Sequence, residues 1–209
     1  MINFIIEPMF SIPVYKILLN GLSDEMNLES FLRGELDNNP NEEKYDNEVE
    51  QTYPDLHLKK EMQPLCDNIF KALECILNDV LFIVSGYQID ITAMWANKQK
   101  SNQQFGLHRH HNNILSGVFY ANEGDSFPPI TFYNPIDPQL RPTHTGKYNQ
   151  FNSITYLQPA VKDMLIIFPA YLDHSVSINE SDKERISLSF NVILRGQHEM
   201  KYSMQSVQF

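Results

Sequence analysis

Along residues 87–95 apolar and polar positions alternate with a period of two, which is the pattern of a half-buried β-strand. Short apolar runs continue beyond this segment, separated by turn-forming residues such as Gly124, Gly146 and Pro169. We therefore expect further strands at 115–120, 130–133, 153–157, 164–168, 174–178 and 185–194.

Upstream of these strands the apolar positions recur at spacings of three and four residues, as on one face of a helix. The longest such stripe predicts a helix over about 62–84, with Gly86 as its stop. Ser23 is a suitable N-cap for an earlier helix that begins at residues 24–25, and Gly34 is expected to end that helix.

Many short strands after a helical opening predict an α+β, mainly β fold. The expected architecture is an antiparallel double sheet, a double-stranded β-helix or jelly roll, with N-terminal helices flanking it. A chain of 209 residues fits one well-buried domain over residues 1–209. Its helical part covers about 1–86 and its sheet core about 87–195.

The net charge of the chain narrows the range of binding partners that we expect. The chain has 16 Lys and Arg against 26 Asp and Glu, a net charge of −10, and it lacks a basic stripe, so no nucleic-acid partner is expected. Residues 35–61 hold nine of the acids against three lysines, and Asn38 to Asn41, around Pro40, break any regular element there. We expect this segment to be a solvated loop.

The chain lacks a run of about 18 apolar residues, so no membrane-spanning helix is expected. Residues 1–8 have no basic flank and do not resemble a signal peptide. Cys66 and Cys75 point to opposite faces of the predicted helix and cannot form a disulfide with each other. These features predict a cytoplasmic protein, and an exposed apolar strand edge could support a homodimer.

Histidines are the first candidates for chemistry. His108 and His110 project from the same face of an extended segment, whereas His111 points away. His174 follows 64 residues after His110, and only a closed sandwich could bring it to the pair. Two imidazoles on one strand and a third on a distant strand form a three-ligand face, which leaves positions open for oxygen and a chelating substrate at iron.

Arg185 is the second candidate. Arg185, Ser187 and Ser189 share one face of a predicted strand, opposite the apolar residues Ile186 and Leu188. A buried guanidinium needs a partner, and one carboxylate of a bound dicarboxylate would serve, helped by the Ser187 hydroxyl. The alternative is an ordinary ion pair with an acid of the protein at a strand end.

Taken together, these motifs resemble the iron(II)/2-oxoglutarate-dependent oxygenases, and most closely a small family of them found in bacteria and phages. The resemblance covers nearly the whole chain. It rests on Phe10 to Tyr15, Trp95-Ala96-Asn97, His108-Arg109-His110, Leu115 to Tyr120, Phe168-Pro169 with His174, and Arg185 to Asn191.

The resemblance implies a dioxygenase, most simply a hydroxylase, that acts on a small-molecule or peptide substrate. It implies that the catalytic His108, His110 and His174 bind Fe(II) and that Arg185 and Ser187 anchor the far carboxylate of 2-oxoglutarate. Tyr120 could also hydrogen-bond this cosubstrate, and so could Tyr133; Asn113 and Asn191 are further residues that could line the pocket.

His110 departs from the wider superfamily, which has Asp or Glu at this position. Three interpretations follow: His110 is a true third ligand, it supports a site completed by water or a more distant acid such as Asp125, or the protein binds metal without oxygenase activity. The last corresponds to a cupin-like three-His metal protein, an isomerase or a binding module, that does not use 2-oxoglutarate.

Overall fold

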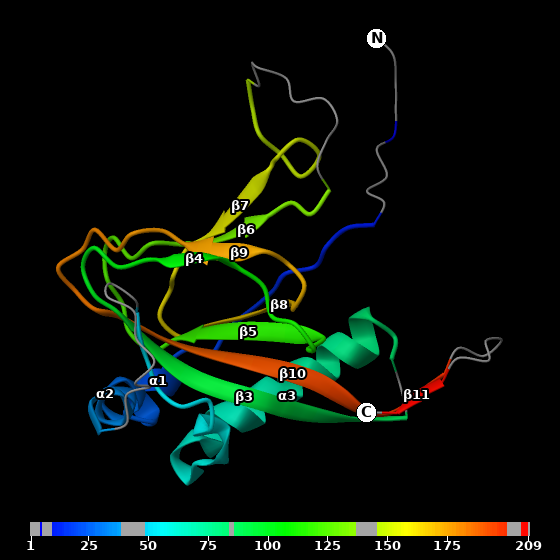
Figure 1. Cartoon of the computed structure of the whole chain (residues 1–209), viewed down its shortest axis with the longest axis horizontal. Coiled ribbons are helices and arrows are strands. Elements are labelled where there is room, and N and C mark those ends of the chain that lie inside the picture. Colours follow the sequence, from blue (N-terminus) through cyan, green and yellow to red (C-terminus); the bar gives the residue numbers. More distant parts are fainter. Residues whose placement is uncertain are drawn as a thin grey trace.

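Two antiparallel sheets face each other in this protein, and helices cover the outer side of the larger sheet (Figure 1). The structure is a computed structural model that describes residues 5, 10–38, 49–83, 86–136, 146–199 and 206–208. The predicted mainly β jelly roll with flanking helices is confirmed.

The sheets are built from strands that are distant in sequence. The larger sheet has the order β1 (Tyr15–Leu18), β8 (Met164–Pro169), β5 (Leu115–Tyr120), β10 (Arg185–Glu199), β3 (Tyr87–Gln99) and β2 (Glu50–Gln51), and β11 (Ser206–Gln208) pairs with β10. The smaller sheet has the order β4 (Phe105–His108), β9 (His174–Val176), β6 (Ile130–Tyr133) and β7 (Thr155–Gln158).

Two apolar clusters hold these layers together. The larger cluster lies between the larger sheet and the helices α2 (Leu28–Asn38) and α3 (Gln63–Cys75), where α3 continues as a π-helical turn, Ile76–Val80. The smaller cluster lies between the two sheets and contains Val118, Ile130 and Phe168. The space between the sheets is therefore only partly filled by apolar side chains, and the remainder is available for a site.

Most predicted strands are confirmed, two of them with both bounds. The predictions at 115–120 and 130–133 coincide with β5 and β6, whereas 87–95 and 185–194 are the first parts of the longer strands β3 and β10. The sequence analysis did not predict β4 and β11, nor the strands β1 and β2. The latter two add to the larger sheet as short strands, and β2 pairs Glu50 with Lys98 and Gln51 with Asn97.

Both predicted ends of the first helix are wrong. The helix α1 (Leu22–Glu25) is capped by Asp163, whose carboxylate accepts hydrogen bonds from the backbone N–H groups of Gly21 and Ser23. A carboxylate about 140 residues away thus takes the capping role that the sequence pattern assigned to Ser23. Gly34 lies inside α2, where burial of Leu36 in the next turn offsets the low helix propensity of glycine.

The prediction of a solvated loop over 35–61 is also wrong for the residues that the structure describes. The segment contains the end of α2, strand β2 and two 3₁₀ turns, Leu56–Leu58 and Lys60–Met62. Its acids form ion pairs: Glu35 with Lys59, and Glu50 with both Lys98 and Lys100. Acidic residues here attach the segment to the edge of the larger sheet.

The two cysteines lie on opposite faces of α3, as predicted, with Cys66 buried, Cys75 exposed and both free. Within the part of the chain that the structure describes, no helix has the length and apolar character needed to cross a membrane.

Candidate metal centre

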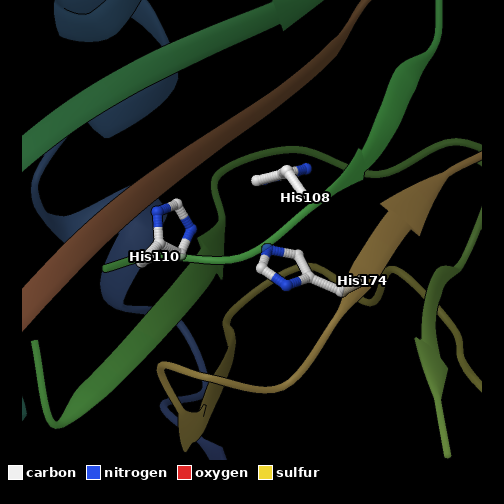
Figure 2. Close-up of side chains that lie close together, drawn as sticks. All are labelled: His108, His110 and His174. Atoms are coloured by element: carbon white, nitrogen blue, oxygen red, sulfur yellow. The ribbon is translucent and has the colours of Figure 1, made fainter. Parts of the chain in front are cut away.

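Three histidine side chains converge between the two sheets (Figure 2). His108 is the last residue of β4 and pairs in register with His174, the first residue of β9. His110 follows in the same segment, where its backbone N–H donates to the carbonyl of Ala170. One ring nitrogen from each of the three imidazoles lies within 4.8 Å of the others, so the group could hold one metal ion.

Backbone carbonyls orient two of these rings. The Nδ1 atom of His108 lies 2.8 Å from the carbonyl oxygen of Gly106, and Nδ1 of His174 lies 2.9 Å from that of Leu172. Because a carbonyl oxygen can only accept, each Nδ1 carries the hydrogen and leaves the Nε2 lone pair free. Neutral imidazoles with a fixed free nitrogen are what a metal ligand requires.

The surroundings keep two of the three rings, His110 and His174, uncharged. Burial lowers the pKa of His174 to about 3 and the pKa of His110 to about 4, and the adjacent His108 lowers both in the same direction. Both rings are therefore neutral at pH 7, and a metal ion would not have to displace protons from them.

An ion pair on the exposed side links the two segments that carry the histidines. Arg109 lies between His108 and His110, and Asp173 precedes His174. The Arg109 guanidinium donates two hydrogen bonds of 2.6 Å to the Asp173 carboxylate, one from Nε and one from Nη2. This bidentate geometry joins the end of β4 to the start of β9 and favours the observed spacing of the rings.

The histidines open into a pocket with one polar and one apolar wall. The polar wall comes from the larger sheet and consists of Gln51, Trp95, Asn97, Arg185, Ser187 and Ser189. The apolar wall comes from both sheets and consists of Phe105, Gly117, Val118, Ile130, Phe168 and Val176. None of the lining residues that the structure describes is an acid.

Arg185 is the only permanently charged residue among those lining residues, and it is 2% exposed. One of its Nη atoms donates to the Ser187 hydroxyl at 3.3 Å, while its Nε–H is buried without a hydrogen-bond partner. Its guanidinium lies 5.0 Å from the centre of the Tyr120 ring, and the buried Tyr120 hydroxyl also lacks a partner. Burial lowers the pKa of Arg185, which shows how poorly the protein alone compensates this charge.

These observations fit a metal ion together with a dianionic ligand. Three imidazole nitrogens suit iron(II) and other divalent transition metals. The unpartnered donor of Arg185 fits a carboxylate, because a guanidinium binds that group through paired hydrogen bonds. The arrangement can hold a metal at one end of the pocket and a carboxylate of a ligand at the other.

Other residues weighed in the sequence analysis lie elsewhere. Tyr133 points away from the pocket and hydrogen-bonds Ser175 on the outer face of the smaller sheet, because neighbouring residues of a strand face opposite sides. Asn191 accepts a hydrogen bond from Ser116, and Asn113 one from Thr92, so neither lines the pocket. Asp125 is exposed and does not join the histidine group.

Comparison with known proteins identifies the region that carries this site. Residues 93–191 match the family described as "Putative 2OG-Fe(II) oxygenase". This match makes the region around the histidines similar to the 2-oxoglutarate/iron(II) oxygenases. The family's cofactors are iron(II) and 2-oxoglutarate, which agrees with the predicted cofactors. No curated protein matches the sequence.

Solved structures of low sequence identity share the fold of this protein. A Pseudomonas putida prolyl-4-hydroxylase is 15% identical with a TM-score of 0.64, covering 89% of this chain and 95% of that chain. The α-ketoglutarate-dependent epimerase SnoN from nogalamycin biosynthesis is 13% identical with a TM-score of 0.65, covering 87% and 78%. A viral collagen prolyl hydroxylase from Paramecium Bursaria Chlorella virus-1 is 13% identical with a TM-score of 0.53, covering 86% and 94%.

Sequence reasoning missed two parts of this candidate site. Gln51 lies in a segment without regular periodicity, and only the pairing of β2 with β3 brings it to the pocket. The Arg109–Asp173 pair joins residues 64 apart, and no local pattern predicts it. The sequence offers a weak indication of this pair, since Arg109 and Asp173 are each adjacent to a candidate histidine.

Proposed function

We propose that this protein is a hydroxylase that acts on a small-molecule or peptide substrate, with iron(II) held by His108, His110 and His174. The observation that carries the proposal is the buried Arg185, whose Nε–H has no hydrogen-bond partner, in the same pocket as three imidazoles. A permanently charged group in such a place is costly unless a ligand compensates it. A diacid that reaches from the metal to Arg185 would do so.

Each residue has a role in this proposal. Arg185 binds the far carboxylate of 2-oxoglutarate, and its hydrogen bond to Ser187 fixes the direction of the guanidinium. Tyr120 supports the guanidinium from behind with the face of its ring, and its hydroxyl is a further donor for the cosubstrate. The apolar wall excludes water from the pocket, which strengthens the interaction between the charges inside.

When bound, iron(II) and 2-oxoglutarate would supply the oxidation of the substrate by dioxygen, with one oxygen atom entering the substrate and the other entering the succinate formed from 2-oxoglutarate as carbon dioxide leaves. The protein contributes position and charge. Hydroxylation is favoured because two of the similar structures are prolyl hydroxylases, although the epimerase SnoN shows that the fold also carries other reactions.

A cupin-like metal protein that does not use 2-oxoglutarate is the second candidate, and the absence of an acid from the described histidine group favours it. Such a protein would need no ligand for Arg185. Several further points stay predictions: one domain over residues 1–209, a cytoplasmic location, assembly as a homodimer and action without nucleic acid.

Turnover in the absence of substrate tests the proposal. Purified protein with iron(II), ascorbate and 2-oxoglutarate should form succinate and consume oxygen. The variants His174→Ala and Arg185→Ala should abolish succinate formation. The matched control is His111→Ala, which removes an exposed imidazole from the same segment and should leave the rate unchanged. If 2-oxoglutarate neither binds nor is consumed by iron-loaded protein, the hydroxylase assignment is wrong.

A further inference from the structure

The charges of the pocket do not balance when both cofactors are bound. A divalent metal ion and Arg185 together carry three positive charges, and the imidazoles that hold the metal are neutral. The dianion of 2-oxoglutarate supplies two negative charges. Since none of the described lining residues is an acid, one positive charge stays uncompensated in a partly buried space. A carboxylate in place of His110 would have cancelled it.

The nearest acid in sequence does not supply the missing charge. Asp173 is adjacent to His174, but both of its oxygens accept hydrogen bonds from Arg109 on the exposed side. Because the pair is neutral as a unit, it leaves the charge of the pocket unchanged. Since none of the described lining residues supplies this negative charge, the remaining sources of it are a ligand and the solvent.

A second set of polar groups lies beside the metal site, on the wall formed by β2, β3 and β10. Trp95 contacts the ring of His110 edge-on, with 5.8 Å between the ring centres. Its indole N–H donates to the side-chain oxygen of Asn97 at 3.1 Å, and Gln51 donates to the same oxygen at 2.7 Å. Because an indole N–H can only donate, these bonds fix which end of the Asn97 amide is the oxygen.

Both ends of the Asn97 side-chain amide are therefore occupied by hydrogen bonds, whereas Gln51 and Ser189 each keep a free donor. Its amide nitrogen donates to the Ser189 hydroxyl oxygen at 3.0 Å and to the Ser187 carbonyl at 3.5 Å. Ser189 accepts this bond, so its own hydroxyl hydrogen is free to point elsewhere. Gln51 uses one amide hydrogen on Asn97 and keeps the second. Both residues line the pocket.

The position of Gln51 is set from the other side of its strand. Glu50, the preceding residue, forms ion pairs with Lys98 and Lys100. Consecutive residues of a strand point to opposite faces, so these ion pairs hold β2 with Gln51 directed at Asn97. Two oriented donors and one excess positive charge are the elements of a carboxylate site.

We propose that the substrate of this enzyme carries a carboxylate, which binds next to the metal at Gln51 and Ser189. The inference rests on the proposed function, because the excess charge exists only with metal and 2-oxoglutarate bound. It assigns two ends of the polar wall to two ligands. Arg185 and Ser187 take the cosubstrate, whereas Gln51 and Ser189 take the substrate.

Binding of a simple monocarboxylate tests the proposal without turnover. Protein loaded with manganese(II), a paramagnetic ion used in place of iron(II), and saturated with 2-oxoglutarate is titrated with butanoate. Manganese(II) broadens the proton resonances of a ligand that binds near it. Butanoate should show saturable broadening and bind at least about tenfold tighter than butanamide, its neutral analogue, because hydrogen bonds to a charged group are the stronger ones.

Variants locate the site. Ser189→Ala and Gln51→Glu should each weaken butanoate binding by about tenfold or more, since the first removes a donor and the second adds a repelling charge. Ser189→Ala should leave the affinity for 2-oxoglutarate unchanged, and Gln51→Glu should lower it much less than it lowers butanoate binding. The matched controls are Ser175→Ala, on the outer face of the smaller sheet, and Gln63→Glu, on the exposed start of α3. Both controls should bind butanoate like the unaltered protein.

Equal binding of butanamide and butanoate would overturn the proposal. So would chloride that excludes butanoate, because a small inorganic anion would then compensate the charge. Loading the protein with manganese(II) and 2-oxoglutarate distinguishes a failure of the carboxylate site from a failure of the proposed function. Protein that does not take up manganese(II) and 2-oxoglutarate contradicts both, whereas protein that takes up both but discriminates poorly between butanoate and butanamide contradicts only the carboxylate site.

Discussion

The two faces of strand β10 have opposite characters. On the face toward the helices, Ile186, Leu188 and Phe190 are fully buried in the larger apolar cluster. Packing there is so close that a Cβ added to Gly117, which pairs with Phe190, would lie 2.2 Å from the phenyl ring. On the face toward the pocket, Arg185 is equally buried, yet its Nε–H lacks a partner.

This contrast separates two reasons for burial. The helix-side face is complete within the protein, because its side chains satisfy one another by contact alone. The pocket-side face is incomplete within the protein, because it buries the charge of Arg185 and leaves its Nε–H without a partner. One strand therefore stabilises the fold with one face and prepares a binding site with the other.

The largest expected effect comes from the helix-side face. Leu188→Ala should lower the free energy of unfolding by about 2–5 kcal/mol, because it removes a fully buried side chain and leaves a cavity. Denaturation by urea, followed by circular dichroism, measures this loss. The affinity of the remaining folded protein for 2-oxoglutarate should not change. A loss of affinity at constant stability would contradict the division between the two faces.

A substitution on the pocket-side face should have the opposite effect on the free energy of unfolding. Arg185→Met replaces a buried, poorly compensated charge by an apolar side chain of similar length. In the metal-free protein we expect the free energy of unfolding to stay the same or to rise by about 1–3 kcal/mol. The same urea denaturation measures it. A loss comparable to that of Leu188→Ala would show that Arg185 serves the fold.

A smaller effect concerns the ion pairs that hold β2 and Gln51. Burial alone would raise the pKa of Glu50, but hydrogen bonds from Lys100 and Lys98 outweigh it and lower this pKa to about 2. A carboxyl with a lowered pKa stabilises the folded state above its unfolded pKa of about 4.5, and that contribution is lost as the pH falls towards 2.

Glu50→Gln should therefore cost about 1 kcal/mol at pH 7, a value that allows for screening by solvent, and much less near pH 2.5. Urea denaturation of both proteins between pH 7 and pH 2.5 measures the difference. A difference that does not change with pH would contradict the ionic role of Glu50. At pH 7 the variant should also bind butanoate more weakly, because Gln51 loses its support.

Periodicity predicted most strands and the long helix, because burial of one face repeats every two residues in a strand and every three to four in a helix. The pairing of His108 and His110 followed from the same rule. Features made by residues far apart in sequence were not predictable in this way. Asp163 caps α1, and β2 brings Gln51 to the pocket, through contacts that exist only in the assembled sheets.

Binding of 2-oxoglutarate to the iron(II) protein in the absence of oxygen tests the central claim most directly. The formation of a visible charge-transfer band on titration reports chelation of the metal by the cosubstrate. We predict this band for the unaltered protein, no band for His174→Ala, and a titration shifted by about a hundredfold or more for Arg185→Met. An unchanged titration for Arg185→Met, or no band for iron-loaded unaltered protein, would contradict the account.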